Sequence, residues 1–124
     1  IEFTGLCPRV PNTLKAHALM IWARGVGSLG SVNKLQEVIF RKYFTDGIYL
    51  DTPALTSAAE EAGFSADAAL EALDSGHFEN QVRLDVAEQK SMGITSVPTF
   101  FINNKPLFVG PQTPEAFLDA FMKA

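Results

Sequence analysis

Apolar residues recur at helical spacing over most of the chain. In residues 13–24 and again in residues 31–43, they stand three or four positions apart, which places each set on one face of a helix. Further helices are predicted over residues 53–62, 66–73 and 77–92, and from Pro114 onward. The apolar faces of these helices are Leu14, Ala18, Ile21 and Trp22; Val32, Leu35, Val38, Ile39 and Tyr43; and, near the C-terminus, Phe117, Leu118 and Phe121.

Short polar residues mark where these helices begin. Their side-chain oxygens can accept hydrogen bonds from the free amides of a first helical turn. The sequence predicts such caps at Asn12, Ser31, Thr52, Ser65 and Thr113. Glycine, which tolerates the left-handed conformation at a helix end, is expected to terminate four of the helices. These glycines are Gly25, Gly63, Gly76 and Gly93.

Residues 93–110 have the alternation and turn residues of a β-hairpin. The apolar run 99–102 predicts one strand, and Asn103 and Asn104 can form a tight turn because asparagine tolerates a positive φ. Pro98 opens this strand, where the missing N–H of proline is tolerated. The residues alone favour a trans proline, because cis X–Pro bonds are the minority. The phenylalanines of this part of the chain are predicted to be core residues: Phe100, Phe101, Phe108, Phe117 and Phe121.

A further extended segment lies at the beginning of the chain. Residues 1–6, "IEFTGL", alternate well enough to predict a short strand before Pro8. With the hairpin this makes three strands, and with the helices it predicts an α/β fold. Three strands form a thin sheet for so apolar a chain, so we expect that a strand is missing. The chain also begins without methionine, which indicates a processed, truncated or incompletely ordered chain.

Composition narrows the possible functions. The chain has 124 residues, 47% of them hydrophobic, which suits one globular domain. Its net charge of −4 gives no basic surface of the kind that binds nucleic acid. No apolar run is long enough for a membrane helix, and the first residues lack the pattern of a signal peptide. The single cysteine, Cys7, excludes an internal disulfide and a zinc site of several cysteines, and is compatible with a reducing cytoplasm.

Three blocks of sequence resemble one protein family in the same order. The block "PNTLKAHALMIWA" is similar to the helix after that family's second strand, and "LQEVIFRKYFTDGIYLDTPALTSAAEEAG" is similar to its helical insertion. The block "MGITSVPTFFINNKPLFVGPQTPEAFLDAF" contains the Val97–Pro98 pair, an aromatic strand and the pattern G-x-Q-x-P-E-x-F before the last helix. On these residues the chain resembles the DsbA-like thioredoxin-fold proteins, in particular the FrnE-type thiol-disulfide oxidoreductases.

This resemblance implies a thioredoxin-like (DsbA-like) α/β fold with a helical insertion. It implies that residues 1–124 are a single partial domain, in which residues 13–92 form the helical region and residues 93–124 the proline hairpin and the last helix. The family carries a Cys-x-x-Cys on the helix after its first strand, and this sequence has no such motif. The N-terminal strand and the redox helix are therefore expected to be missing. In the family, the proline that matches Pro98 is cis and faces the redox cysteines, which implies that Val97 and Pro98 bind substrate.

The remaining candidates for chemistry are Cys7 and two histidines. The tetrapeptide "CPRV", which begins at Cys7, looks like a Cys-Pro-x-Cys motif with valine in place of the second cysteine, and Arg9 would favour the thiolate. Cys7 precedes the expected cap at Asn12 within a loop, however, so a structural role is expected rather than a catalytic one. His17 is expected to border the buried face of its helix, and His77 to lie on the surface. No residues have metal-ligand spacing, so neither a metal nor a cofactor is expected.

Three functions are compatible with these observations. The first is a thiol-disulfide oxidoreductase of the bacterial cytoplasm, acting on a thiol- or disulfide-containing protein or a small thiol, with this chain inactive by itself. The alternative is a glutathione-dependent enzyme of the same fold, such as 2-hydroxychromene-2-carboxylate isomerase or a kappa-class transferase, although the segment "VGPQTPEAF" fits their pattern less well. The third is a non-enzymatic fragment that forms a homo-oligomer through an exposed sheet edge.

Overall fold

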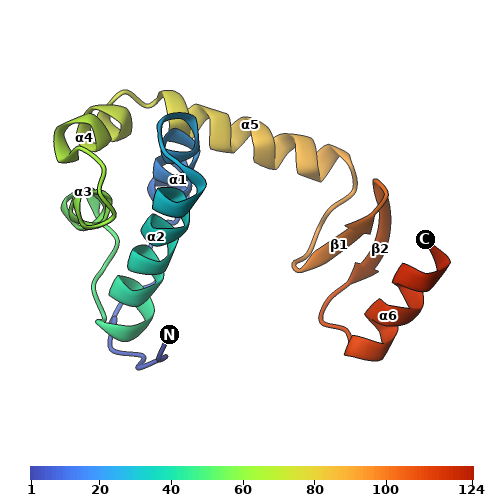
Figure 1. The fold of residues 1–124 in the computed structure, drawn as a ribbon. Helices are drawn as coiled ribbons and strands as arrows, with labels where there is room; N and C mark the ends of the chain where they lie inside the picture. The colour runs from blue at the N-terminus through green and yellow to red at the C-terminus, as the bar shows by residue number, and fades with distance from the viewer. The chain divides into compact units, whose positions relative to one another are not determined.

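The computed structural model describes residues 1–124 and contains two compact units. Unit 1 comprises Ile1–Asp85 and unit 2 comprises Val86–Ala124 (Figure 1). The chain forms six α-helices, one short π-helix and two strands. The division proposed from the sequence, into residues 13–92 and 93–124 of one partial domain, stays a prediction.

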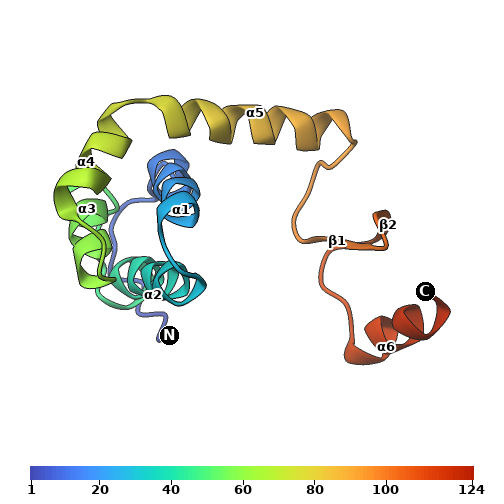
Figure 2. The same cartoon turned by 45° about the horizontal axis from the view of Figure 1, so that its top comes forward.

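Unit 1 is helical. Helix α1 packs against α2 and α4, and α3 packs against the same two helices, so that the four surround a common centre (Figure 2). The π-helix η1 directly follows α2, and α5 contains the boundary between the two units. The bounds are α1 Leu14–Val26, α2 Leu29–Phe40, η1 Arg41–Thr45, α3 Thr52–Glu61, α4 Ala66–Asp74 and α5 His77–Ser91.

Side chains from α1 to α4 form one buried core. The fully buried leucines Leu19, Leu35 and Leu55 come from three different helices. Burying each of them contributes about 1.5–3 kcal/mol relative to leaving it exposed. The apolar face predicted for this helix is confirmed at Val32, Leu35, Val38 and Ile39 of α2, which are all buried. Its fifth residue, Tyr43, lies in η1 and is half-buried.

Two of the predicted helix caps stand too late in the sequence. Ser28, rather than Ser31, caps α2: its hydroxyl oxygen accepts from the Ser31 N–H at 3.2 Å. Asp51, rather than Thr52, caps α3: its carboxylate accepts from the Ala54 N–H at 3.0 Å. A capping oxygen reaches the amide three residues ahead, and in both helices an earlier polar residue meets this condition. Each helix therefore begins before the residue expected to cap it.

The other predicted caps agree with the structure. Ser65 and Thr113 are confirmed, since each side chain accepts from the amide three residues ahead at 3.3 Å. Asn12 precedes the assigned cap position, Thr13, and its side-chain oxygen accepts from the Leu14 N–H at 3.0 Å. Short polar side chains thus determine where these helices begin.

Residues 1–6 form no strand, so the strand predicted there is wrong. They run along η1 instead, where the Thr4 N–H donates to the Phe44 carbonyl at 2.9 Å. The Thr45 hydroxyl in turn donates to the Glu2 carbonyl at 2.6 Å. Unit 1 contains no strand with which this segment could form a ladder, so isolated hydrogen bonds hold it in place.

An ion pair joins η1 to α3. The two terminal nitrogens of Arg41 donate to the two carboxylate oxygens of Glu61 at 2.7 and 2.8 Å. The hydrogen-bonded guanidinium holds the pKa of Glu61 below its usual value, and the same contact raises the pKa of Arg41. Because both side chains are about two-fifths exposed, solvent screens the pair and it contributes modestly to stability.

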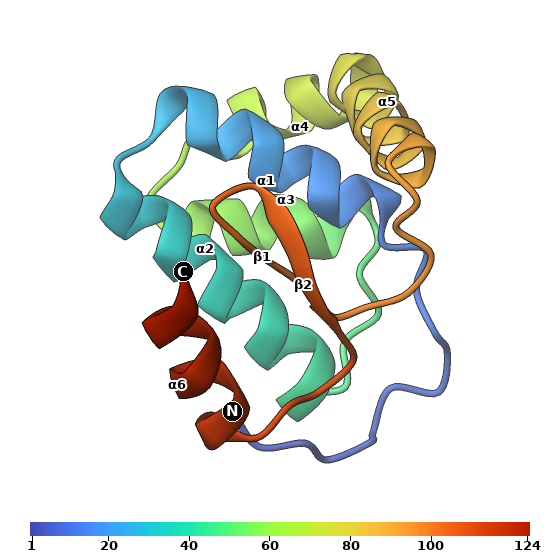
Figure 3. The same cartoon turned by 90° about the vertical axis from the view of Figure 1, so that its right-hand side faces the viewer.

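Unit 2 contains an antiparallel hairpin followed by one helix (Figures 1 and 3). Strand β1 spans Thr99–Ile102, β2 spans Lys105–Val109 and α6 spans Pro114–Lys123. The predicted turn is confirmed, since Asn103 and Asn104 have φ of 50° and 60°. The sheet has two strands rather than the three predicted.

One ring connects the hairpin to α6. The ring of Phe117 lies 4.8 Å from that of Phe100 and 5.4 Å from that of Phe108, measured between centroids. The prediction that the phenylalanines are core residues is wrong for Phe101 and Phe121, which are 40% and 61% exposed. A single helix covers only one face of a two-stranded sheet, and alternation along β1 turns Phe101 to the other face. Unit 2 consequently has no fully buried residue.

Candidate functional site

The predicted substrate-binding residues, Val97 and Pro98, lie in the loop before β1. Val97 is 89% exposed, and its peptide bond to Pro98 is cis. Neither the backbone N–H nor the carbonyl of Val97 takes part in a hydrogen bond. The loop therefore presents one donor, one acceptor and an apolar side chain to any extended chain that lies beside it.

Two hydrogen bonds hold the backbone on either side of Val97. On the N-terminal side, the Ser96 carbonyl accepts from the Thr99 hydroxyl at 2.6 Å. On the C-terminal side, the Pro98 carbonyl accepts from the Gly110 N–H at 2.8 Å. Thr99 is the first residue of β1 and Gly110 follows the last residue of β2, so both strands of the hairpin anchor the loop.

The chemistry available at this loop is binding. Residues 86–124 contain neither cysteine nor histidine, so unit 2 supplies no thiolate and no imidazole. The structure holds no group of three or more His, Cys, Asp or Glu side chains placed to bind a metal ion. An exposed backbone beside an apolar side chain is instead suited to pairing with a peptide in the manner of an added strand.

Cys7 lies in a half-buried loop position of unit 1. Its thiol donates to the Arg9 carbonyl at 3.3 Å, and α1 begins only at Leu14. The thiol is therefore not at a helix N-terminus, the position that lowers the pKa of a redox cysteine. The Arg9 guanidinium lies 4.1 Å from the centroid of the Tyr49 ring, a cation–π contact that holds it on the ring.

Both histidines lie at the surface. His17, expected to border the buried face of α1, is exposed. His77 begins α5 and is exposed, which agrees with the prediction, and its ring packs edge-on against that of Phe78 at 5.0 Å. Neither side chain makes a hydrogen bond that would orient it for acid–base chemistry.

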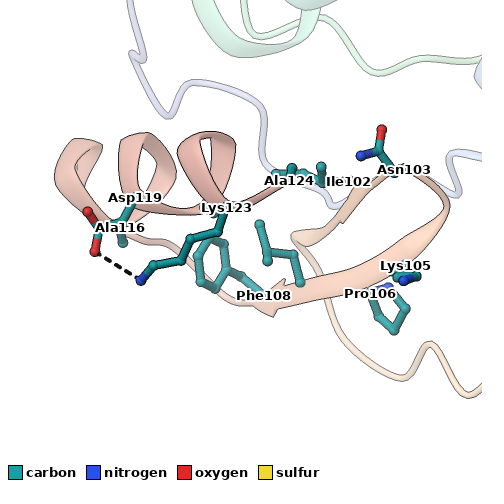
Figure 4. Close-up of a pocket in the computed structure, with 11 residues that line it drawn as sticks. Ile102, Asn103, Lys105, Pro106, Phe108, Ala116, Asp119, Lys123 and Ala124 are labelled. Atoms are coloured by element: carbon teal, nitrogen blue, oxygen red, sulfur yellow. Dashed lines mark hydrogen bonds and ion pairs between the residues drawn. The ribbon is translucent and has the colours of Figure 1, made fainter.

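A shallow groove of about 660 Å³ runs between β2 and α6 within unit 2 (Figure 4). Phe108 and the small side chains Ala116 and Ala120 contribute to its lining. Lys123 extends toward Asp119, to which it donates at 3.5 Å. The groove is open and mostly apolar, and the sequence did not point to it, since Phe108 was expected in the core.

The sequence also missed the two residues that anchor the Val97 loop. The sequence pattern places Thr99 only within an apolar strand and Gly110 only at the end of the hairpin. Two features of the sequence could have indicated these anchors: a hydroxyl residue directly after the proline, and a glycine directly after the second strand. In the structure Gly110 has a φ of 82°. A glycine accommodates that conformation without the steric cost that other residues bear.

Comparisons with known proteins identify the family. No match was found among curated proteins or among solved structures. The family model of the DSBA-like thioredoxin domain matches residues 1–122. None of the helices is both long and apolar enough to cross a membrane. Because the match extends over nearly the whole sequence and the elements form the α/β arrangement expected of it, the chain belongs to the DSBA-like thioredoxin domain family.

Proposed function

We propose that this chain supplies the substrate-binding loop of a thiol-disulfide oxidoreductase. The observation that carries the proposal is the exposed and unpaired backbone of Val97 in a chain of the DSBA-like thioredoxin domain family. Residues 1–124 contain one cysteine, so the proposed redox pair, Cys-x-x-Cys, belongs to polypeptide outside these residues. Three blocks of the sequence resemble FrnE-type proteins and occur in the same order, which supports a FrnE-type oxidoreductase within this family.

The proposed reaction is thiol-disulfide exchange. A thiolate of the redox pair attacks one sulfur of a substrate disulfide, so that a mixed disulfide forms and the second substrate sulfur leaves as a thiolate. The other thiolate of the pair then attacks the mixed disulfide and releases the first substrate sulfur. The substrate gains two electrons and the redox pair becomes a disulfide, while the reverse sequence oxidises a substrate.

In this reaction, residues 96–98 hold the substrate rather than react with it. The N–H and carbonyl of Val97 pair with an extended segment beside the substrate cysteine, and the Val97 side chain packs against it. Such pairing fixes the position of the substrate sulfur, which raises its effective concentration at the thiolate. The proposed substrate is a protein segment or a small thiol, and the proposed location is the cytoplasm, with which a single cysteine is compatible.

Peptide binding tests the proposal directly. The probe is a fluorescein-labelled extended peptide that carries one cysteine as a mixed disulfide with glutathione, and fluorescence polarisation measures its affinity for the chain. Val97→Asp should weaken binding at least tenfold, because it places a charge against an apolar contact. The matched control is Val10→Asp, since Val10 is 88% exposed in a loop of unit 1 and should leave the affinity unchanged.

The outcomes separate the candidate functions. Equal weakening by Val97→Asp and Val10→Asp, or no binding by the unaltered chain, would contradict the proposal. Unmodified glutathione that binds tightly and displaces the peptide would instead support the glutathione-dependent isomerase or transferase. In an insulin-disulfide reduction assay the chain alone is expected to be inactive, and turnover that Cys7→Ser removes would assign catalysis to Cys7.

Self-association is a second candidate function, and the edges of the sheet favour it. Each strand of the two-stranded sheet has one unpaired edge, and Phe101 and Val109 are 40% and 63% exposed. Residues 94–104 carry no charge, so two copies can pair there without like-charge repulsion. We propose a homo-oligomer formed in this way. Light scattering should show a mass that rises with concentration, and a monomer at every concentration would contradict it.

A further inference from the structure

The loop that carries Val97 is held by a hydroxyl group that the proposed chemistry does not otherwise use. The Thr99 hydroxyl donates to the Ser96 carbonyl at 2.6 Å, which closes a tight turn around Val97 and Pro98. The Gly110 N–H donates to the Pro98 carbonyl at 2.8 Å and fixes the other end of that turn. Both carbonyls that flank Val97 are thus occupied within the chain.

These two bonds hold the backbone on both sides of Val97 and leave the groups of Val97 itself free. The carbonyls of Ser96 and Pro98 each accept one bond within the chain, whereas neither the N–H nor the carbonyl of Val97 is paired. An extended peptide that lies beside this loop can therefore pair with both free groups of Val97. Fixing the turn before binding also removes part of the entropy cost that ordering a loop would otherwise add to association.

We infer that Thr99 is a positioning residue, whose hydroxyl orients Val97 for pairing with an extended peptide. This inference rests on the proposed function, because it concerns the same loop. Thr99 itself is half-buried, and its hydroxyl bonds to the Ser96 carbonyl. It therefore affects peptide binding by fixing the turn that presents Val97. Gly110 supports the same turn from the end of β2 through its backbone.

The test compares three single variants in the peptide-binding assay. Thr99→Val removes the hydroxyl with little change in shape and should weaken binding roughly three- to tenfold, the effect of losing one hydrogen bond. Thr99→Ser keeps the donor and should bind like the unaltered chain. Thr56→Val is the matched control, because the Thr56 hydroxyl makes a comparable bond of 2.9 Å to the Thr52 carbonyl in α3 of unit 1, and it should not change binding.

A measurement without ligand makes the inference independent of the peptide. In Thr99→Val, the NMR order parameter of the Val97 amide should fall and its chemical shift should move toward the random-coil value. Thr99→Ser should restore both. A Thr99→Val variant that had merely unfolded would instead lose chemical-shift dispersion throughout unit 2.

The two proposals fail in different ways. If the unaltered chain binds the peptide and Thr99→Val binds equally well with an unchanged Val97 amide, the role of Thr99 is wrong and the proposed function stands. If the unaltered chain does not bind but Thr99→Val mobilises the Val97 amide, the proposed function is wrong while Thr99 still positions the turn. Weakening by Thr56→Val of the same size as by Thr99→Val would overturn the inference, because the effect would then not belong to this loop.

Discussion

The two units of this chain differ in how much apolar surface they bury. Unit 1 arranges four helices around Leu19, Leu35 and Leu55, which are fully removed from solvent. Unit 2 has one helix against one face of a two-stranded sheet, and its side chains are at most partly buried. The difference follows from geometry, since a ring of helices encloses a centre whereas a hairpin and a helix enclose only the seam between them. The exposed loop that we propose as the binding site belongs to the thinner unit.

The largest expected effect is a cavity in unit 1. Leu55→Ala should reduce the free energy of unfolding by about 2–5 kcal/mol, because a fully buried leucine loses its contacts and leaves a void. Urea unfolding followed by far-UV circular dichroism measures this change. The matched control in unit 2 is Leu118→Ala, at a residue 61% exposed, which should change the stability by no more than about 0.5 kcal/mol. Equal effects would remove the contrast between the units.

A glycine in each unit tests how tightly the loops are packed. Gly47 and Gly110 have φ of 70° and 82°, so alanine at either costs about 1–2 kcal/mol through the backbone. At Gly47 a new Cβ would also stand 2.6 Å from the Cβ of Leu6, whereas at Gly110 nothing lies within 4 Å. Gly47→Ala should therefore destabilise by about 1–3 kcal/mol more than Gly110→Ala. Thermal unfolding of the two variants measures the difference, and equal melting temperatures would contradict it.

The ring contacts between the hairpin and α6 of unit 2 contribute less to stability. Phe117→Ala removes the ring that contacts Phe100 and Phe108, and should cost about 2 kcal/mol of local stability, less than a fully buried phenylalanine would. Hydrogen exchange should show faster opening of β1, β2 and α6 while the amides of α2 and α3 keep their protection. Phe121→Ala is the control, since Phe121 is 61% exposed and should change exchange only slightly. Uniform acceleration in both units would show that they unfold together.

The smallest effect concerns pH and the Arg41–Glu61 ion pair. The guanidinium lowers the pKa of Glu61 in the folded state, so the pair stabilises unit 1 above the pKa of an ordinary glutamate. This contribution is lost as the pH falls through the lowered pKa and the carboxylate becomes protonated. Glu61→Gln should therefore lower the melting temperature of unit 1 near neutral pH and leave it nearly unchanged in acid. Asp119→Asn, which removes an exposed ion pair of 3.5 Å on α6, should show no such dependence.

Local patterns in the sequence predicted the helices well because their causes are local. The apolar face of α2 and the caps at Ser65 and Thr113 depend on residues within one or two turns. The turn at Asn103 and Asn104 was predicted for the same reason, since two neighbouring residues had to accept positive φ. The resemblance also indicated the family whose model matches residues 1–122.

The predictions that were wrong have a common physical origin: each needed a neighbouring strand or a covering element that the fold does not place there. Residues 1–6 alternate like a strand, but a strand needs a neighbour with which to form a ladder, and η1 offers Thr4 only isolated bonds. Phe101 and Phe121 have the hydrophobicity of core residues, but burial depends on what covers them. Periodicity along a chain shows which side chains face the same way, without showing whether anything lies opposite.

The sequence by itself determined the helices, the hairpin turn, the family resemblance and the candidate pair Val97 and Pro98. Only the tertiary structure showed that the Val97 backbone is free while the carbonyls on either side accept from Thr99 and Gly110. The bond from Gly110 joins the residue after β2 to the residue before β1, and so exists only once the two strands have paired in register. Helical spacing and caps arise from neighbours along the chain, whereas burial, strand pairing and the accessibility of one backbone amide arise from contacts that folding creates.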